Sequence, residues 1–168
     1  DSVCSLDVDI GNYPPVVESV SITPTLDAYV GTTLTCSYTY SDVDGDLVEP
    51  TYEWRNITTG ALIGNISTLT LDANTTEPED IIGCFVTVTD PDGAAGSLDE
   101  QISVQNSSPI IDSISISPSV GVYSDSTLSC SAVFSDLDID IPSISYRWDL
   151  GNNTLAFGDT ITLDANLV

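Results

Sequence analysis

Three aspartates at alternate positions form the densest chemical motif of the sequence. Asp42, Asp44 and Asp46 are separated by Val43 and Gly45, the second of which indicates a tight turn. Alternate carboxylates on such a turn can converge their oxygens on a hard cation, and calcium accepts several oxygen ligands with tolerant geometry. We therefore expect calcium as a cofactor here. The alternative is a solvated acidic turn, which the acidic composition alone could supply.

The same spacing recurs 94 residues later, in Asp136, Asp138 and Asp140, and predicts a second metal site. Neither motif fits an EF-hand, because that loop requires glycine where Leu47 stands and places an acid where the second copy has Arg147. For the second copy the solvated turn is an equally good interpretation, because no further acidic loop follows it.

Catalytic groups other than carboxylates are scarce. The chain contains no His and only two basic side chains, Arg55 and Arg147, so Ser-His pairs, Cys-His pairs and Schiff-base amines are excluded. A carboxylate-pair glycosidase is the one mechanism that the acids leave open, but nothing singles out a pair. We expect no enzymatic activity, and we expect each Arg to pair with a nearby acid or to cover a sheet face.

Charge excludes whole classes of partner. With 26 Asp and Glu against two basic residues, the formal net charge is -24, so nothing can neutralise the phosphates of nucleic acid. Anionic membranes are disfavoured for the same reason, and no apolar run predicts membrane insertion. Nevertheless, 41% of the residues are hydrophobic and the mean hydropathy is +0.15, which predicts a folded protein with an acidic surface.

Cysteine usage and sequons indicate an extracellular or cell-surface location. The four cysteines lack the close spacing of a zinc site and are expected to form disulfides, which require an oxidising compartment; they are Cys4, Cys36, Cys84 and Cys130. Five of the eight asparagines begin an Asn-x-Ser/Thr triplet, and we expect some to be glycosylated, although chance would supply a few; they are Asn56, Asn65, Asn74, Asn106 and Asn152.

The chain repeats itself. Residues 15–24 reappear as residues 109–118, and the same offset of 94 relates Tyr52 and Trp54 to Tyr146 and Trp148. The domains that we predict are an N-terminal donor strand or linker over 1–13, a first domain over 14–106 and a second over 107–168. Apolar residues alternate with polar ones, as in Leu34, Cys36 and Tyr38, which predicts strands with one buried face and an antiparallel β-sandwich.

Here a resemblance becomes specific. Cys36 is followed by Trp54 and then by Cys84, an arrangement that resembles the immunoglobulin fold. The acidic loop and residues 86–93 resemble the tandem immunoglobulin-like repeats of bacterial surface proteins, which are relatives of cadherin and polycystic-kidney-disease modules. The resemblance implies a Cys36–Cys84 disulfide across the core. It also implies that Asp90 and Asp92 lie at the same pole as the acidic loop and contribute to its metal site. The Cys-to-Trp spacing exceeds that of antibody domains by the length of the acidic loop.

The second domain is incomplete. The first domain continues through strands expected at residues 82–90 and 101–105, whereas the second stops before either. Residues 1–12, with Cys4, Leu6, Val8 and Ile10 on one face, match the first of these strands if Cys4 is laid on Cys84, or the second if Asn12 is laid on Asn106. We expect this segment to complete the second domain of a neighbouring copy, bringing Cys4 to Cys130. The alternative is one period of a longer tandem array.

The fold class that we predict is therefore all-β, with tandem immunoglobulin-like antiparallel sandwiches, the second completed by a donated strand. As function we predict a structural subunit of an extracellular fibre or surface coat, a homo-polymer of head-to-tail copies stiffened by calcium and disulfides. The alternative is an adhesion or carbohydrate-binding module with a cell-surface or glycan partner. That alternative requires exposed aromatic clusters on loops, whereas Trp54 and Trp148 occupy positions that face a core.

Overall fold

The computed structural model describes residues 11–165, which are all-β and contain no helix. The chain divides into two compact units between Asn106 and Ser107. We call the part up to Asn106 unit 1 and the part from Ser107 unit 2. The donor segment expected at the amino terminus lies outside the described residues as far as residue 10. The described part of the chain contains no helix that could span a membrane.

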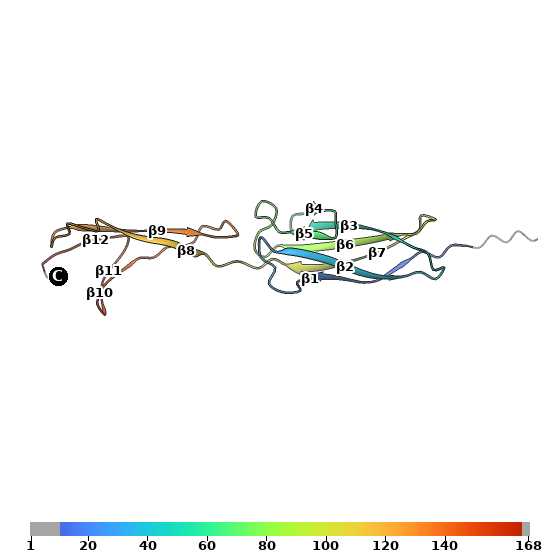
Figure 1. The fold of residues 1–168 in the computed structure, drawn as a ribbon, viewed down its shortest axis with the longest axis horizontal. Coiled ribbons are helices and arrows are strands. Elements are labelled where there is room, and N and C mark those ends of the chain that lie inside the picture. Colours follow the sequence, from blue (N-terminus) through green and yellow to red (C-terminus); the bar gives the residue numbers. More distant parts are fainter. Residues whose placement is uncertain (1–10, 166–168) are drawn as a thin grey trace, which may run out of the picture. The chain divides into compact units, whose positions relative to one another are not determined.

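Unit 1 is a sandwich of two antiparallel sheets (Figure 1). The first sheet has the order β1-β2-β5 and is built from β1 (Val16–Thr23), β2 (Thr33–Ser41) and β5 (Thr68–Thr70). The second has the order β4-β3-β6-β7 and is built from β3 (Glu49–Asn56), β4 (Ala61–Gly64), β6 (Ile81–Thr89) and β7 (Ala95–Ser103). This two-layer, all-antiparallel arrangement is the predicted immunoglobulin-like sandwich.

The core of unit 1 lies between the two sheets. Alternate residues of the strands point inward, and the disulfide between Cys36 on β2 and Cys84 on β6 joins the layers with an S–S distance of 2.05 Å. Trp54 lies opposite Cys84 in the β3–β6 ladder, is fully buried, and donates its indole N–H to the carbonyl of Ile66 at 2.8 Å. Closing a loop of 48 residues, this disulfide contributes about 4 kcal/mol by restricting the unfolded chain.

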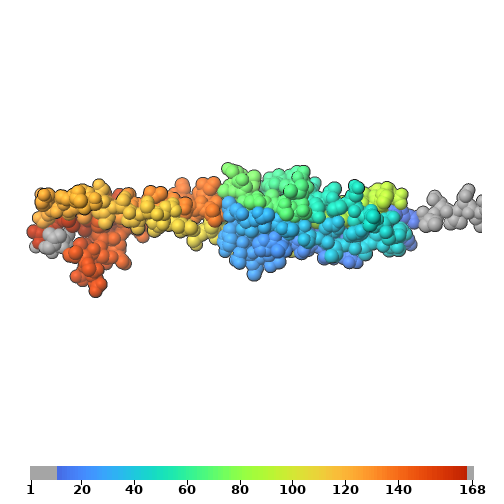
Figure 2. Space-filling model, viewed as in Figure 1, coloured from blue at the N-terminus to red at the C-terminus, as the bar shows by residue number. Residues whose placement is uncertain are grey.

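Unit 2 repeats only part of this plan. One sheet, of order β12-β9-β8, contains β8 (Ile110–Ser117), β9 (Thr127–Ser135) and β12 (Thr160–Thr162), the counterparts of β1, β2 and β5. A separate hairpin contains β10 (Arg147–Leu150) and β11 (Asn153–Phe157), the counterparts of β3 and β4. In residues 107–165 no strand corresponds to β6 or β7. Within unit 2, the hairpin projects from the three-stranded sheet (Figures 1 and 2).

The missing strands leave the inner face of unit 2 without cover. Ile111, Ile114 and Ile116 of β8 are 63%, 63% and 48% exposed. The corresponding residues of β1 are buried, with exposed fractions of 8% for Val17 and Val20 and 3% for Ile22. The sequence is equally apolar in both copies, so the difference arises from the strands that pack above it. Residues 107–165 therefore form only part of a sandwich of the kind seen in unit 1.

Candidate metal centre

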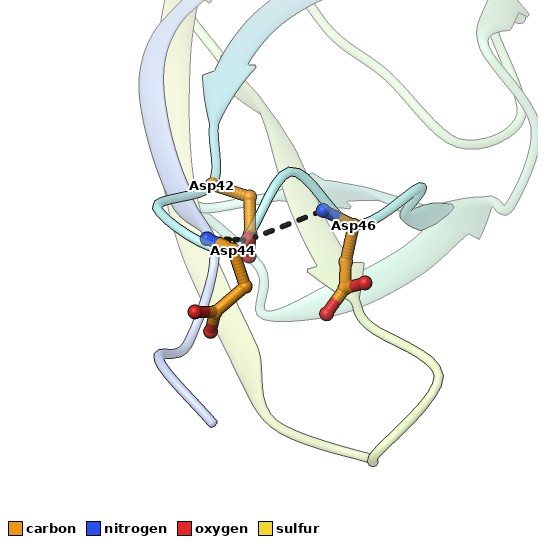
Figure 3. A group of neighbouring side chains, drawn as sticks. All are labelled: Asp42, Asp44 and Asp46. Atoms are coloured by element: carbon orange, nitrogen blue, oxygen red, sulfur yellow. Dashed lines mark hydrogen bonds between the residues drawn. The ribbon is translucent and has the colours of Figure 1, made fainter. Parts of the chain in front are cut away.

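The acidic loop directly after β2 gathers three carboxylates. One oxygen each of Asp42, Asp44 and Asp46 lies within 4.8 Å of the others. The side chains of Asp44 and Asp46 project to the same side of the loop (Figure 3). Gly45 takes a positive φ of 78°, which lets the chain turn between them without steric cost. The expected convergence of alternate carboxylates is therefore present in the structure.

Asp42 both shapes the loop and leaves one oxygen unsatisfied. Its Oδ1 accepts hydrogen bonds from the backbone N–H of Asp44 at 2.8 Å and of Asp46 at 3.3 Å (Figure 3). Its Oδ2 is buried and has no hydrogen-bond donor among the described residues. A buried carboxylate oxygen without a partner is costly. A cation beside Asp42 would remove that cost, so the donor set fits a hard oxygen-binding ion.

Asp44 connects the loop to the start of unit 1. Its Oδ2 accepts a hydrogen bond from the backbone N–H of Tyr13 at 2.7 Å. This contact orients the carboxylate of Asp44. Sequence reasoning missed the role of Tyr13, although the repeat offers a signal, because it aligns Tyr13 with Ser107 at the start of unit 2.

Asp90 and Asp92 lie at the same pole but outside the tight group. Asp90 is 5% exposed, and its two oxygens accept hydrogen bonds from Asn12 Nδ2 and from the backbone N–H of Ala94, each at 2.8 Å. The hydrogen bond from Asn12 is the main reason that the pKa of Asp90 is lowered. Asp92 is exposed on the turn between β6 and β7. The structure thus gathers three of the five expected ligands, and Asp90 joins the turn between β6 and β7 to the start of the unit.

The two outer aspartates still act on the cluster through their charge. The pKa of Asp46 is raised, first by burial and then by the neighbouring carboxylates, which are Asp42, Asp44, Asp92 and Asp90 in decreasing order of effect. Negative charges this close oppose ionisation of Asp46. A divalent cation would reverse the sign of that interaction.

The second acidic loop has a related but looser arrangement. Asp138 Oδ2 accepts hydrogen bonds from the backbone N–H and hydroxyl of Ser107, at 2.5 and 2.7 Å. The backbone N–H of Asp138 donates to Asp136 Oδ1 at 2.8 Å. Asp138 is 9% exposed, and its Oδ1 is buried without a donor in the described part of the chain, as in the first loop. Asp140 is exposed, and these three do not form a tight group within residues 11–165.

The predictions for the cysteines and the arginines can also be compared with the structure. Cys36 and Cys84 form the disulfide implied by the resemblance, Cys130 has no disulfide partner among the described residues, and Cys4 lies outside them. Arg55 pairs with Glu53 at 2.7 Å and Arg147 with Asp149 at 2.9 Å. Both pairs are exposed and contribute little to stability.

Asn56 is a correction to the predicted glycosylation sites. Its side chain is fully buried, and its Nδ2 donates to Asp80 Oδ2 at 2.6 Å and to the carbonyl of Thr75 at 3.1 Å. A glycan on this nitrogen cannot be accommodated in the folded unit, so the prediction at Asn56 is wrong. The other four sequon asparagines are exposed: Asn65, Asn74, Asn106 and Asn152.

Comparisons with known proteins identify no family. No family model matches the chain, and no curated protein matches it. Among solved structures, the PKD1 domain of the Vibrio cholerae metalloprotease PrtV aligns with a TM-score of 0.38 and 18% identity, over 55% of this chain and 99% of that one. Three N-terminal domains of the bacteriophage RB49 outer capsid protein Hoc align with a TM-score of 0.33 and 19% identity, over 90% of this chain and 48% of that one. The fold assignment therefore depends on the strand order and the inter-sheet disulfide.

Proposed function

We propose that this chain is a structural subunit of an extracellular fibre or surface coat. Calcium at the acidic loops and the Cys36–Cys84 disulfide stiffen the units, and a strand donated between copies completes unit 2. The observation that carries the proposal is the uncovered inner face of unit 2, where Ile111 is 63% exposed although its counterpart Val17 is 8% exposed. Such a face is unstable in water and becomes stable when a further strand covers it.

Calcium has a specific role in this proposal. At the first loop Asp42 Oδ2 and the carboxylates of Asp44 and Asp46 would hold the ion, which would neutralise the repulsion that raises the pKa of Asp46. At the second loop Asp136 and Asp138 would take the same role, with the buried Asp138 Oδ1 as a ligand. Each ion would fix the loop to the residues at which its unit begins.

An adhesion or carbohydrate-binding module is the other candidate function. It requires aromatic side chains grouped on an exposed surface. In the part of the chain that the structure describes, the most exposed aromatic residues are Tyr13, Tyr123 and Phe157, which belong to separate segments, while Trp54 is buried. This distribution supports the structural role over the binding role.

Calcium binding is tested by thermal unfolding of the full chain in chelator and in millimolar calcium. An ion that binds only the folded state stabilises it by about 2.7 kcal/mol at a hundredfold excess over Kd, so calcium should raise Tm. Asp42→Asn should remove most of this rise. Asp27→Asn, on the loop between β1 and β2, is the matched control and should keep it. An identical melt in chelator and calcium contradicts the calcium sites.

Assembly is tested by electron microscopy of the full chain and of a variant lacking residues 1–10. This truncation keeps Asn12 and Tyr13, whose contacts with the acidic pole would otherwise be lost. We expect fibres from the full chain in calcium and dispersed particles from the variant. Fibres of the same appearance from the truncated chain contradict strand donation.

A further inference from the structure

We infer that unit 2 binds residues 4–8 of a second copy in the position that β6 occupies in unit 1, alongside β10, with Cys4 bonded to Cys130. This inference rests on the proposed function and deepens it, because it names the donated strand, its neighbour and its register. Three observations within unit 2 lead to this inference, and each can be compared with the corresponding feature of unit 1.

The first observation is an unused strand edge. In unit 1, β3 pairs with β4 on one side and with β6 on the other, from Glu49 opposite Thr89 to Asn56 opposite Ile82. In unit 2, β10 pairs with β11 only, among the described residues, and residues 143–146 form no strand although they correspond to the first half of β3. Backbone N–H and C=O groups along this edge therefore lack the ladder that β6 supplies in unit 1.

The second observation is an apolar cavity of about 260 Å³ on the inner face of unit 2. Its lining includes Ile111, Ala132, Phe134 and Ile144. Ile144 corresponds to Pro50 of β3, which lies opposite the fully buried Val88 of β6. The cavity therefore lies where β6 places its inward side chains in unit 1.

The same β6 face supplies a second side chain to the core. Val86 is fully buried and lies opposite Tyr52, whose counterpart Tyr146 precedes β10. A strand that fills the cavity must therefore present two apolar side chains two residues apart, because alternate residues of a strand share one face.

The third observation is the position of Cys130. It lies opposite Ile116 in the β8–β9 ladder, as Cys36 lies opposite Ile22 in the β1–β2 ladder. Cys130 is half-buried and has no disulfide partner in residues 11–165. Because Cys36 bonds a cysteine on the strand beside β3, Cys130 is placed to bond a cysteine on a strand beside β10.

The register of the donated strand against β10 follows from Trp148. In unit 1 Cys84 lies opposite Trp54 in the β3–β6 ladder. The counterpart of Trp54 is Trp148 on β10, which pairs with Ala156 of β11 on its other side. The incoming cysteine should therefore lie opposite Trp148.

Residues 4–8 have the required pattern. On β6 the inward residues are Cys84, Val86 and Val88, and the segment 4–8 has the same spacing with Cys4, Leu6 and Val8. We place the larger Leu6 in the cavity, whose lining includes a small side chain.

That small side chain is Ala132, which stands where unit 1 has Tyr38 and lines the cavity. Ser5 and Asp7 would point to the outer face of the sheet, where polar side chains are stable.

The alternative position, that of β7, is less favourable. In unit 1 β7 is an edge strand whose ladder partner is β6. A strand in the β7 position of unit 2 would have no ladder partner until the β6 position is filled. With Asn12 laid on Asn106, Cys4 would moreover fall on Leu98, which is 41% exposed in unit 1. The β6 position is therefore the one that unit 2 requires first.

Bond formation needs an oxidant, for which a small disulfide such as oxidised glutathione suffices. The Cys4 thiolate attacks the small disulfide and releases one thiolate, and the Cys130 thiolate then displaces the second. The net reaction converts two protein thiols and one small disulfide into one protein disulfide and two small thiols. Their two protons pass to the released thiolates.

The test is mass spectrometry of the full chain assembled with calcium in a glutathione redox buffer, using a mixture of unlabelled and ¹⁵N-labelled copies. We expect a Cys4–Cys130 peptide of mixed isotope composition and a ladder of covalent oligomers on a non-reducing gel. Cys4→Ser should remove both. Moving the cysteine by one residue, with Cys4→Ser and Ser5→Cys together, is the matched control: the thiol then faces outward, and no bond to Cys130 should form.

The outcomes separate this inference from the proposed function. If fibres form and depend on residues 1–10 but contain no Cys4–Cys130 peptide, the β6 position is wrong and strand donation stands. If the peptide never has mixed composition, the donor is the same chain and not a second copy. If the control variant forms the bond as readily as the natural sequence, the register is wrong. If neither fibres nor the peptide form, both proposals are wrong.

Discussion

Burial and neighbouring charges oppose ionisation of Asp46 in the acidic loop. Its pKa lies above 3.8 in the folded state because of burial first and then because of four neighbouring carboxylates. A raised folded pKa means that the folded state binds the proton more tightly than the unfolded state does. Without a cation, the charge of Asp46 therefore opposes folding at neutral pH. This penalty disappears as the pH falls through the raised pKa towards the unfolded value.

We therefore expect Asp46→Asn to raise Tm in chelator at neutral pH. The gain should shrink as the pH falls through the raised pKa of Asp46 and should vanish below about 3.8, where the natural side chain is protonated in both states. In calcium the sign should reverse, because the variant loses one of the ligands that we propose for the ion. Scanning calorimetry across pH measures both effects, with Asp27→Asn as control. A gain that does not vary with pH contradicts this account.

Asn56 yields a second prediction at the residue scale. Asn56→Ala removes the 2.6 Å hydrogen bond to the buried Asp80, which keeps only the backbone N–H of Glu77 as donor to the same oxygen. Leaving a buried carboxylate short of a donor costs about 3 kcal/mol. Urea unfolding, followed by Trp54 fluorescence in a Trp148→Phe background, measures the loss. Asn65→Ala, at an exposed sequon, should change stability by less than about 0.5 kcal/mol. Equal losses in the two variants contradict the proposed role of Asn56.

At the scale of strands, the start of β7 lies very close to β1. A Cβ added at Gly96 would overlap the carbonyl oxygen of Pro15, a backbone atom that cannot rotate away. We expect Gly96→Ala to cost about 1–3 kcal/mol, the usual range for overpacking. The neighbouring, exposed Ser97→Ala should be neutral. Urea denaturation of unit 1 measures both, and a neutral Gly96→Ala shows that the two strands can move apart.

β3 and β10 show how far the sequence predicts strands. Alternation places Tyr52 and Trp54 on an inward face, and the repeat assigns the same face to Tyr146 and Trp148. β3 nevertheless spans eight residues and β10 four. Periodicity determines which face of a strand is apolar, whereas its length depends on a partner strand that is distant in sequence.

At the candidate site too, the sequence predicts local features but not those that depend on contacts distant in sequence. The spacing of Asp42, Asp44 and Asp46 is local and predicts their convergence. A triplet such as that of Asn56 carries no information about burial, and the hydrogen bonds that occupy Asp90 come from Asn12 and Ala94 in the folded unit. Those two contacts depend on tertiary structure, which the local pattern does not contain.

At the scale of the whole chain, the two units should differ in stability. Unit 1 has two complete sheets and an inter-sheet disulfide, whereas unit 2 exposes its inner face. In a chain lacking residues 1–10, we expect amides of β3 and β6 to exchange hydrogen slowly and amides of β9 and β10 to exchange much faster. Addition of a peptide spanning residues 1–10 should slow exchange in unit 2 alone. Equal protection of both units before the addition contradicts the incomplete sandwich.

The bond between Tyr13 and Asp44 has a mechanical consequence. Because the Tyr13 N–H donates to Asp44 Oδ2, tension applied to the chain before unit 1 reaches the acidic loop before it reaches the first pair of the β1–β2 ladder. Ser107 makes the equivalent bond to Asp138 in unit 2. A cation that immobilises these carboxylates would anchor the point at which load is applied, so the force needed to peel β1 or β8 from its sheet would rise with the calcium concentration of the surroundings.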